Sequence, residues 1–279
     1  VVYARDKDSG PLARHLVDQF EDSGFFILEN VFSAAETRAL QQESARVRAN
    51  VAGDERVEEP GQGAIRSVFA IHETDSLFAR LPRDRRFMEI AQFLLDDDVY
   101  LHQSRLNYKP GFCGREFFWH SDFETWHVED GMPAMRAVSM SVTLTSNTPD
   151  NGPLLLVPGS HRQFVGCEGE TPEKHFRQSL RRQEYGTPER SLLEDIIEEN
   201  GIRAADAPAG SVIFFDCNML HGSNGNITPY PRSNAFYVYN AMSNQVVAPF
   251  CGLEPRPEYL CERNPSQPLR AVEQVFVDG

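Results

Sequence analysis

The spacing of apolar positions changes near residue 99 of this 279-residue chain. Before that point apolar residues recur every three or four positions, which is typical of helices packed on a core. After it they alternate with polar residues or form short β-rich runs between Gly, Pro and Asn turns, which is typical of strands. We therefore expect one domain over residues 1–279, with a helical N-terminal part at about 1–98, a β core at about 99–245 and a C-terminal tail at 246–279.

Several local signals set the ends of the expected elements. Gly24 is expected to end a first helix, and Ser33 and Glu36 form a capping-box signature that begins a second one. A second capping box at Ser191–Glu194 begins a late helix, which ends at Asn200-Gly201. The expected helices are Leu12–Asp22, about Ser33–Asn50, Arg85–Leu95 and the one ending at Asn200. The polar, Gly-rich stretch Gly53–Gly63 is expected to be a mobile loop.

The expected strands are short and number more than the helices. They are Phe25–Leu28, Val99–Tyr108, Ala137–Thr145, Pro153–Val157, Ser211–Cys217 and Ser233–Tyr239, with a tight turn at Asn151-Gly152. This pattern predicts a mainly β fold, a sandwich or barrel with helices packed on its outside.

Composition narrows the classes of function. The formal charge is −14 and the pI about 5.0. Nucleic acid binding needs a basic face, so the balance argues against that partner. An anionic ligand needs a cationic pocket built against this background. No apolar run approaches the roughly 18–20 residues that span a bilayer, so we do not expect a membrane protein.

The cysteines indicate free thiols. There are five, an odd number, and none forms a CxxC pair: Cys113, Cys167, Cys217, Cys251 and Cys261. This favours a reducing, cytoplasmic environment over a secreted disulfide framework.

Three residues suggest a metal site. The pattern His-x-Asp/Glu occurs at His120-Ser121-Asp122 and at His127-Val128-Glu129, about as often as chance allows. On a strand, His120 and Asp122 would share one face, and His221 follows the expected strand Ser211–Cys217. Two histidines and one carboxylate are typical of non-haem iron(II) oxygenases, because they leave open positions on the ion. On spacing alone, ordinary polar turn residues remain an alternative.

Arg232 makes the set more specific. It follows His221 by 11 residues and begins a strand on which Arg232, Asn234 and Phe236 share one face. A guanidinium can pair bidentately with the distal carboxylate of a 2-oxo acid that chelates the metal, and Ser223 can add a hydroxyl. A zinc hydrolase with the same three ligands has no use for such a clamp.

Three segments carry a resemblance to a known family. They resemble the phytanoyl-CoA dioxygenase superfamily and are the run Phe117–His127, the pair Asn151–Pro153 with Pro158–His161, and the run Met219–Ser223. The block Trp119–Arg136 is similar to the ectoine hydroxylases within it. The likeness runs from about Phe25 to Asn240, most of the chain.

The resemblance implies a double-stranded β-helix (jelly-roll, cupin-like) core with Fe(II) at its mouth. It implies that 2-oxoglutarate and O2 are consumed, giving succinate and CO2, and that ectoine becomes 5-hydroxyectoine. By position, the iron ligands are His120, Asp122 and His221. The 2-oxoglutarate contacts are Asn107, Phe117, Ser223 and Arg232. The substrate contacts are Gln103, Arg105, Trp126, Phe215, Asn234 and Phe236. The likeness also suggests a homodimer.

The substrate chemistry agrees with these residue types. Ectoine is a small zwitterion with a ring amidinium and a carboxylate. Gln103, Arg105 and Asn107 alternate on one face of a strand, and burying them requires polar partners. Arg105 can hold the carboxylate and Trp126 can cover the amidinium. An exposed sheet edge and a core tryptophan are the plain alternatives. Ser139 and Ser141 leave room for a ligand or are close-packing positions.

Other readings stay open from the residues alone. The enzyme could act on another zwitterion such as proline, or the chain could be a metal-binding β-barrel sensor without turnover. His161 is interpreted as a structural turn residue, and His127 and Glu129 as groups beside the site or on the surface. The charged segment Gln163–Arg190 is a candidate lid or a solvated excursion.

Overall fold

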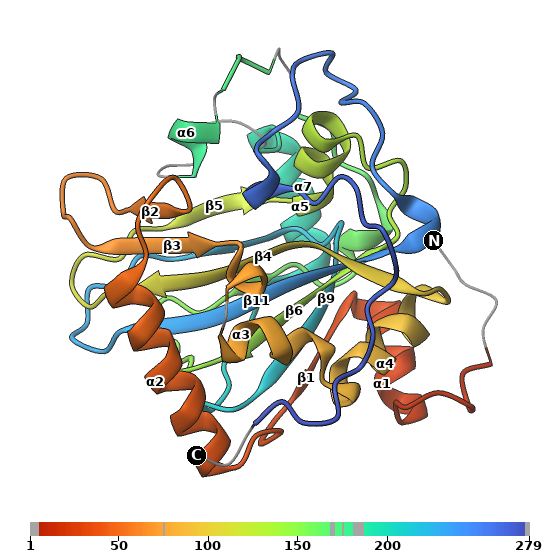
Figure 1. The fold of residues 1–279 in the computed structure, drawn as a ribbon. Coiled ribbons are helices and arrows are strands. Elements are labelled where there is room, and N and C mark those ends of the chain that lie inside the picture. The colour runs from red at the N-terminus through yellow and green to blue at the C-terminus, as the bar shows by residue number, and fades with distance from the viewer. Residues whose placement is uncertain (1–5, 75, 168–170, 175, 181–186, 277–279) are drawn as a thin grey trace.

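Two antiparallel sheets form the centre of the molecule, one of seven strands and one of four (Figure 1). The computed structural model describes residues 6–74, 76–167, 171–174, 176–180 and 187–276. Leu156 of the small sheet packs with Phe215 and Phe236 of the large one, so the sheets face each other across a shared core. The expected mainly β class with flanking helices and a jelly-roll core is confirmed.

The strand pairings are all antiparallel. The large sheet has the order β1-β9-β6-β11-β4-β3-β2, with β1 Phe25–Leu28, β2 Arg56–Glu58, β3 Ile65–Phe69, β4 Val99–Lys109, β6 Ala137–Thr143, β9 Val212–Asp216 and β11 Arg232–Ala241. The small sheet has the order β5-β10-β7-β8, with β5 Phe117–His120, β7 Leu155–Leu156, β8 Arg203–Ala204 and β10 His221–Ser223.

The helices lie on the outside of this pair of sheets. They are α1 Arg14–Ser23, α2 Ala34–Asn50, α3 Leu77–Arg80, α4 Arg85–Leu95, α5 Asp122–Thr125, α6 Phe176–Ser179 and α7 Arg190–Asn200. In Figure 1, α1 to α4 cover one face of the large sheet, and α5, α6 and α7 lie on the side of the small sheet. No helix among the described residues is long and apolar enough to cross a membrane.

The predicted helix ends are confirmed where capping chemistry is strong. The Ser33 hydroxyl accepts a hydrogen bond from the Glu36 N–H at 3.2 Å, and a Glu36 carboxylate oxygen accepts one from the Ser33 N–H at 2.8 Å. Helix α1 ends at Ser23, and the next residue, Gly24, has a φ of 80° that favours glycine. The bounds of α4 and β1 are those predicted.

Two predictions of local structure are wrong. Residues Arg56–Glu58, inside the expected loop Gly53–Gly63, form β2, because they pair with β3 at the edge of the large sheet. The Ser191–Glu194 capping box does not form. Helix α7 begins one residue earlier, and the Ser191 hydroxyl donates to the Glu189 carboxylate at 2.6 Å instead of capping the helix.

The two faces of the large sheet carry different chemistry, and this positions the interior site. Val138, Met140 and Val142 of β6 face the helices and belong to the main apolar core. The Tyr237 and Tyr239 hydroxyls on the same face donate to main-chain carbonyls at 2.9 and 2.8 Å, which fixes the helical layer to the sheet. The alternating positions face the small sheet. They carry the polar side chains Gln103, Arg105, Asn107, Lys109, Ser139, Ser141, Arg232 and Asn234, all buried or nearly so.

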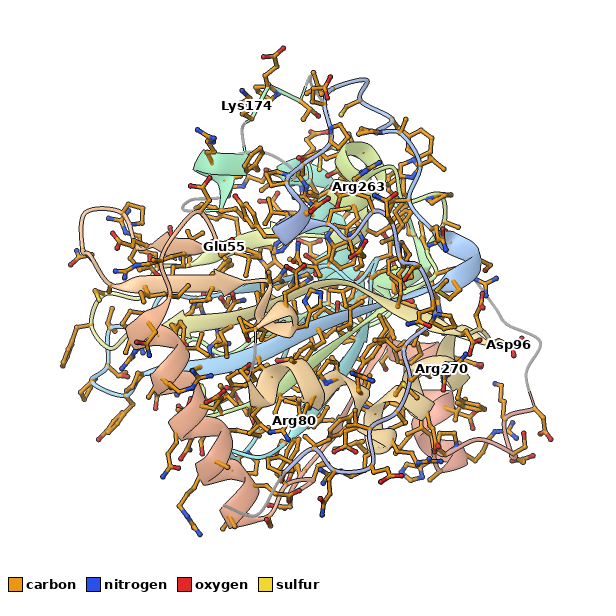
Figure 2. The ribbon with its side chains drawn as sticks, viewed as in Figure 1. Glu55, Arg80, Asp96, Lys174, Arg263 and Arg270 are labelled. Carbon is orange, nitrogen blue, oxygen red and sulfur yellow. The ribbon has the colours of Figure 1, made fainter. Side chains whose placement is uncertain are left out.

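The C-terminal tail runs back across the molecule, as Figure 1 shows in blue. Its main chain donates hydrogen bonds to the carbonyls of His102, Val99 and Arg83. The tail therefore brings residues near 256 beside β4. Charged side chains such as Asp96 and Lys174 project outward from the surface (Figure 2). All five cysteines are unpaired, as expected.

Candidate metal centre and ligand cavities

His120 and His221 are brought together by strand pairing. His120 ends β5, His221 begins β10, and the two residues are register partners in the small sheet. Their ring centroids lie 4.2 Å apart. Asp122 completes the group, with Oδ1 3.7 Å from His120 Nε2 and Oδ2 3.8 Å from His221 Nε2. The three predicted ligands therefore converge on one point.

Asp122 reaches this point from a helix, so the predicted strand through Asp122 is wrong. The strand β5 stops at His120, and Asp122 is the first residue of α5. The turn is anchored to the other histidine-bearing segment, because the Phe123 N–H donates to the Cys217 carbonyl at 2.9 Å. The Ser121 hydroxyl also donates to the Asn218 side-chain oxygen at 3.1 Å.

The donor set fits a bound cation. His120 Nδ1 lies 2.7 Å from the Phe118 carbonyl and His221 Nδ1 2.9 Å from the Met219 carbonyl, so each Nδ1–H is engaged and each Nε2 lone pair is free to bind. Asp122 Oδ2 is buried without a hydrogen-bond partner, which is costly unless an ion satisfies it. Burial, with His221 nearby, lowers the pKa of His120 to about 3. The ring is therefore neutral at pH 7, as metal binding requires.

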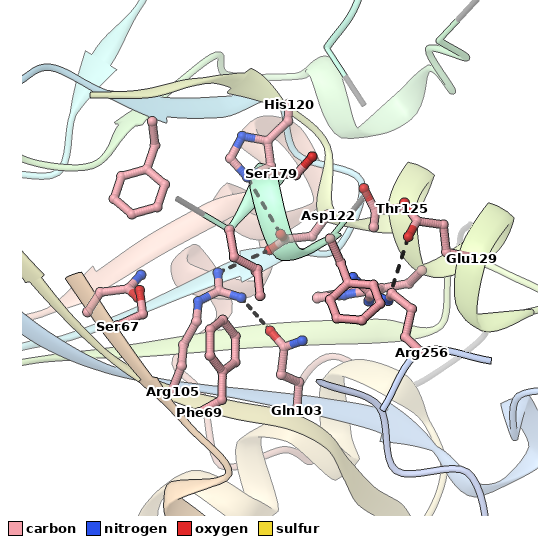
Figure 3. A pocket seen from close by; sticks show the side chains of 15 residues that line it. Ser67, Phe69, Gln103, Arg105, His120, Asp122, Thr125, Glu129, Ser179 and Arg256 are labelled. Carbon is pink, nitrogen blue, oxygen red and sulfur yellow. Dashed lines mark hydrogen bonds and ion pairs between the residues drawn. The ribbon is translucent and has the colours of Figure 1, made fainter. Parts of the chain in front are cut away.

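A cavity opens beside the metal centre (Figure 3). Five predicted residues line it together with His120 and Asp122: Gln103, Arg105, Asn107, Phe117 and Trp126. Figure 3 shows Arg105 and Gln103 pointing to one another below the Asp122 carboxylate. The alternation predicted for β4 therefore places three polar side chains in the cavity wall.

Arg105 is half-buried and partly satisfied within the cavity. It donates to the Gln103 side-chain oxygen at 2.5 Å and lies 3.9 Å from Asp122 Oδ2. Its guanidinium carbon lies 5.2 Å from the centre of the Phe236 ring. Burial lowers the pKa of Arg105, which Asp122 opposes and the nearby Arg256 reinforces.

Arg256, which the sequence analysis did not identify, is the second guanidinium of this cavity. It pairs with both oxygens of Asp130, at 2.8 and 2.7 Å, and lies 3.9 Å from Glu129. Burial raises the pKa of Asp130, but Arg256 and His102 outweigh it and hold that pKa at about 2. His102, Asp130 and Cys261 could hold a metal by their spacing, but Arg256 already occupies both Asp130 oxygens.

Arg232 and Ser223 do not line this cavity. Arg232 is the first residue of β11, and Ser223 is the last residue of β10. The Arg232 residue is 4% exposed, and its Nε has no hydrogen-bond partner. Burial, with Arg66 nearby, lowers the pKa of Arg232 to about 10. Arg232 also lines a second cavity, together with Arg48, Arg56 and Lys109.

Three predicted substrate residues lie behind the cavity wall. The Phe215 ring lies 5.3 Å from that of His221, Phe236 contacts Arg105, and the Asn234 side chain donates to the Ser141 hydroxyl at 2.9 Å. They are buried but are not among the residues that line the cavity.

His161 and His127, the two other histidines considered from the sequence, take structural positions. His161 lies in the turn Ser160–Arg162, and its Nε2 is 3.3 Å from the Glu21 carbonyl. His127 Nδ1 lies 2.7 Å from the Met132 carbonyl. Glu129 is buried in the wall of the cavity rather than on the surface.

The candidate lid contributes to the cavity through α6. Phe176, Ser179 and Leu180 line it. Residues 168–170, 175 and 181–186 of the segment Gln163–Arg190 lie outside the described residues.

Comparison with known proteins gives one consistent picture. The family model for phytanoyl-CoA dioxygenase (PhyH) matches residues 20–234. An ectoine dioxygenase from Stutzerimonas stutzeri is 54% identical, covering 99% of this chain and 93% of its own length. One from Sphingopyxis alaskensis is 51% identical, covering 100% and 92%.

Solved structures agree. A crystal structure of EctD from S. alaskensis with 2-oxoglutarate and 5-hydroxyectoine has a TM-score of 0.88 at 47% identity, covering 98% of this chain and 91% of that chain. The same protein with bound Fe has a TM-score of 0.86, with the same identity and coverage. The carbocyclase SnoK, at 15% identity and a TM-score of 0.67, covers 97% of this chain and 96% of its own and shares the fold alone.

Proposed function

Because the chain belongs to the phytanoyl-CoA dioxygenase family and is about half identical to ectoine dioxygenases over nearly its whole length, we propose that it hydroxylates ectoine to 5-hydroxyectoine. It is an iron(II)- and 2-oxoglutarate-dependent dioxygenase that releases succinate and CO2. The observation that carries the proposal is the convergence of His120, Asp122 and His221 with one buried carboxylate oxygen unsatisfied.

His120, Asp122 and His221 hold the iron. When bound, iron(II) with 2-oxoglutarate and O2 supplies the oxidising chemistry that hydroxylates a substrate C–H bond. The chain's own contribution is to keep the His120 ring neutral, to orient both histidines through their Nδ1–H groups, and to present the free Asp122 oxygen.

The 2-oxoglutarate contacts are Asn107, Phe117, Ser223 and Arg232. Arg232 is the strongest of these, because a buried guanidinium with an unpartnered Nε is suited to a distal carboxylate. Asn107 and Phe117 line the cavity next to the metal ligands, which supports contacts closer to the iron.

Gln103, Arg105 and Trp126 contact the substrate, and Phe215, Asn234 and Phe236 support them from behind the wall. The substrate carboxylate binds toward Arg105 and Arg256, whose positive charges are close enough to disfavour one another. Trp126, buried and edge-on to His102, covers the amidinium. The part of the candidate lid in α6 closes over the bound substrate, a role supported by Phe176 and Leu180 in the cavity wall.

The proposal extends to the organisation and surroundings of the chain. The chain forms one domain, because three strands from before residue 99 belong to the same sheet as the later strands. Its partner is ectoine and not nucleic acid, in keeping with the charge of −14. It works as a homodimer in the cytoplasm, where its five unpaired cysteines stay reduced.

The experiment that tests the function is a substrate panel. Iron is added anaerobically to the protein, followed by 2-oxoglutarate, O2 and either ectoine, proline or another amino-acid derivative, and succinate is measured. Ectoine is expected to give the fastest release, matched by 5-hydroxyectoine. Faster coupled turnover of another zwitterion would overturn the substrate, and binding without succinate release would indicate a sensor.

A further inference from the structure

Asp130 is a fully buried carboxylate that joins three segments of the chain. It ends the single π-helical turn Trp126–Asp130 (η3), and its side chain is 0% exposed. Its two oxygens accept hydrogen bonds from Arg256 Nε at 2.8 Å and from Arg256 Nη2 at 2.7 Å, and one of them lies 3.1 Å from His102 Nε2 on β4. A carboxylate that binds two nitrogens of one guanidinium has a well-defined geometry.

The tail that carries Arg256 is bonded to the wall of the substrate cavity. The Leu260 carbonyl accepts a hydrogen bond from the Gln103 side chain at 2.7 Å. The Glu262 N–H donates to the His102 carbonyl at 2.9 Å. These tail residues lie beyond residue 234, where the match to the phytanoyl-CoA dioxygenase family model ends. The tail therefore adds to the cavity a part that the family match does not include.

The main chain at Asp130 is packed against the same tail. The Asp130 carbonyl accepts a hydrogen bond from Arg263 Nη1 at 2.9 Å, and the Gly131 carbonyl accepts one from the Val247 N–H at 2.9 Å. Gly131 has a φ of 79°, and a Cβ there would lie 2.3 Å from the Val247 carbonyl oxygen, so this close approach requires glycine. The tail thus has contacts beside Asp130 that do not involve Arg256.

The Arg256 guanidinium has one edge in the ion pair and one nitrogen left for a ligand. Nε and Nη2 bind Asp130, and Nη1 makes no hydrogen bond to any described residue. The side chain is 9% exposed and lies in the wall of the cavity, with Nε 3.9 Å from the Glu129 carboxylate (Figure 3). Because a guanidinium is rigid and planar, fixing one edge fixes the direction of its other N–H groups.

We propose that Asp130 is a positioning residue for substrate binding: it holds Arg256 in the orientation in which Nη1 binds the substrate carboxylate. This inference rests on the function proposed above, in which that carboxylate binds toward Arg105 and Arg256. Asp130 does not line the cavity, so it acts through Arg256. The tail then determines substrate choice, because it supplies a carboxylate contact whose direction is set by the body of the domain.

Binding of ectoine to iron- and 2-oxoglutarate-loaded protein without O2 tests the proposal. Asp130→Asn keeps the size of the side chain but cannot accept from both Arg256 nitrogens, so we expect the Kd for ectoine to rise about tenfold or more. The matched control is Arg263→Ala, which removes another contact between the tail and Asp130 and leaves the Arg256 pair intact. Its Kd for ectoine should stay within about threefold of the wild-type value. Equal losses in the two variants, or no loss in Asp130→Asn, would overturn the proposal.

A second substitution decides the matter even if Asp130→Asn does not fold. Arg256→Lys keeps an ion pair with Asp130, but its single ammonium cannot reproduce the two edges of the guanidinium. If Asp130 and Arg256 only hold the tail in place, this variant should bind ectoine as the wild type does. We expect instead a Kd about tenfold or more higher, with the tail as resistant to proteolysis as in the wild type. Wild-type affinity in Arg256→Lys would overturn the proposal.

A double variant tests whether Asp130 acts through Arg256. In protein that already carries Arg256→Ala, adding Asp130→Asn should change the Kd for ectoine by no more than about twofold. A further loss as large as that of Asp130→Asn alone contradicts the proposal. Iron content and the Kd for 2-oxoglutarate are measured in every variant and should not change. If the wild-type protein does not bind ectoine at all, the proposed function itself fails, which is a different result from binding that is insensitive to Asp130.

Discussion

Two arginines, the half-buried Arg105 and the buried Arg232, project from the central strand pair β4–β11 toward the same interior, and they differ in what satisfies their charge. Arg105 bonds Gln103 and lies 3.9 Å from the Asp122 carboxylate. Arg232 faces Lys109 across the strand pair, and among the described residues no carboxylate lies within ion-pair distance of it.

From this difference we propose separate tasks for the two arginines. A guanidinium beside a carboxylate that is itself a proposed metal ligand can orient that carboxylate, and it can accept a substrate carboxylate only by sharing its charge. A guanidinium without a partner leaves a full buried charge uncompensated, which a dianionic co-substrate relieves. We therefore expect changes at Arg105 to affect how substrate oxidation is coupled, and changes at Arg232 to affect co-substrate affinity.

The largest effect is expected at Asp122, the proposed metal ligand that also lies beside Arg105. Asp122→Ala removes a proposed ligand and the counter-charge of Arg105, so iron binding and ectoine turnover should be lost. The fold should remain, because Asp122 begins the short helix α5 and belongs to no apolar cluster. Iron content, product formation and circular dichroism are measured together. The matched control is His127→Ala, from the other His-x-Glu pattern, which should keep its iron. Coupled turnover by Asp122→Ala would contradict the metal assignment.

A smaller but specific effect is expected at Arg232. Arg232→Ala should raise the KM for 2-oxoglutarate by roughly 10- to 150-fold, because a charge-assisted pair is worth about 1.5–3 kcal/mol. The KM for ectoine should change little. Arg232→Lys restores charge without the bidentate geometry and should lie between the two. If ectoine affinity falls and 2-oxoglutarate affinity does not, the two pockets are exchanged.

At Arg105 the expected effect concerns coupling. Arg105→Ala should lower ectoine hydroxylation about tenfold more than it lowers 2-oxoglutarate consumption, because the co-substrate keeps its own clamp. Product and succinate are measured in parallel. Unchanged ectoine kinetics in this variant, together with a large loss in Arg256→Ala, would assign the substrate carboxylate to Arg256 alone.

The smallest effect is expected at Trp126, which adjoins the Arg105 end. Trp126→Phe keeps an aromatic face and should weaken ectoine binding only a few-fold, whereas Trp126→Ala should lose the whole contact, worth about 0.5–2 kcal/mol. Ectoine titrations report both. A thermal melt of each variant separates lost binding from lost packing, since Trp126 is also part of a buried apolar cluster. Equal affinity in all three proteins would exclude a contact between Trp126 and the substrate.

The sequence predicted the parts of the site that depend on local periodicity. The alternation of β4 predicted that Gln103, Arg105 and Asn107 share one face, and all three line the cavity beside the metal centre. The convergence of His120, Asp122 and His221 was also predicted, although the reason offered for His120 and Asp122 was wrong. Their convergence comes from the end of a strand followed by a helix, not from one strand face.

The parts that were missed depend on contacts between distant segments. Arg256 reaches the cavity from a tail whose position is set by hydrogen bonds to His102 and Val99, and no local pattern encodes them. The strand β2 was missed because only its middle residue, Val57, is buried, which leaves no alternation to detect. The sequence around Ser191 resembled a helix cap, but the helix has already begun at Arg190. Arg190 and Glu194, four residues apart in that helix, form an ion pair at 2.8 Å.

The central claim is that this chain couples 2-oxoglutarate oxidation to insertion of dioxygen-derived oxygen into ectoine. The most direct test supplies iron-loaded protein with ectoine, 2-oxoglutarate and isotopically heavy O2, and analyses both products by mass spectrometry. We expect one heavy oxygen atom in 5-hydroxyectoine and one in succinate, formed in equal amounts. Unlabelled 5-hydroxyectoine, or labelled succinate without any oxidised ectoine, would contradict it.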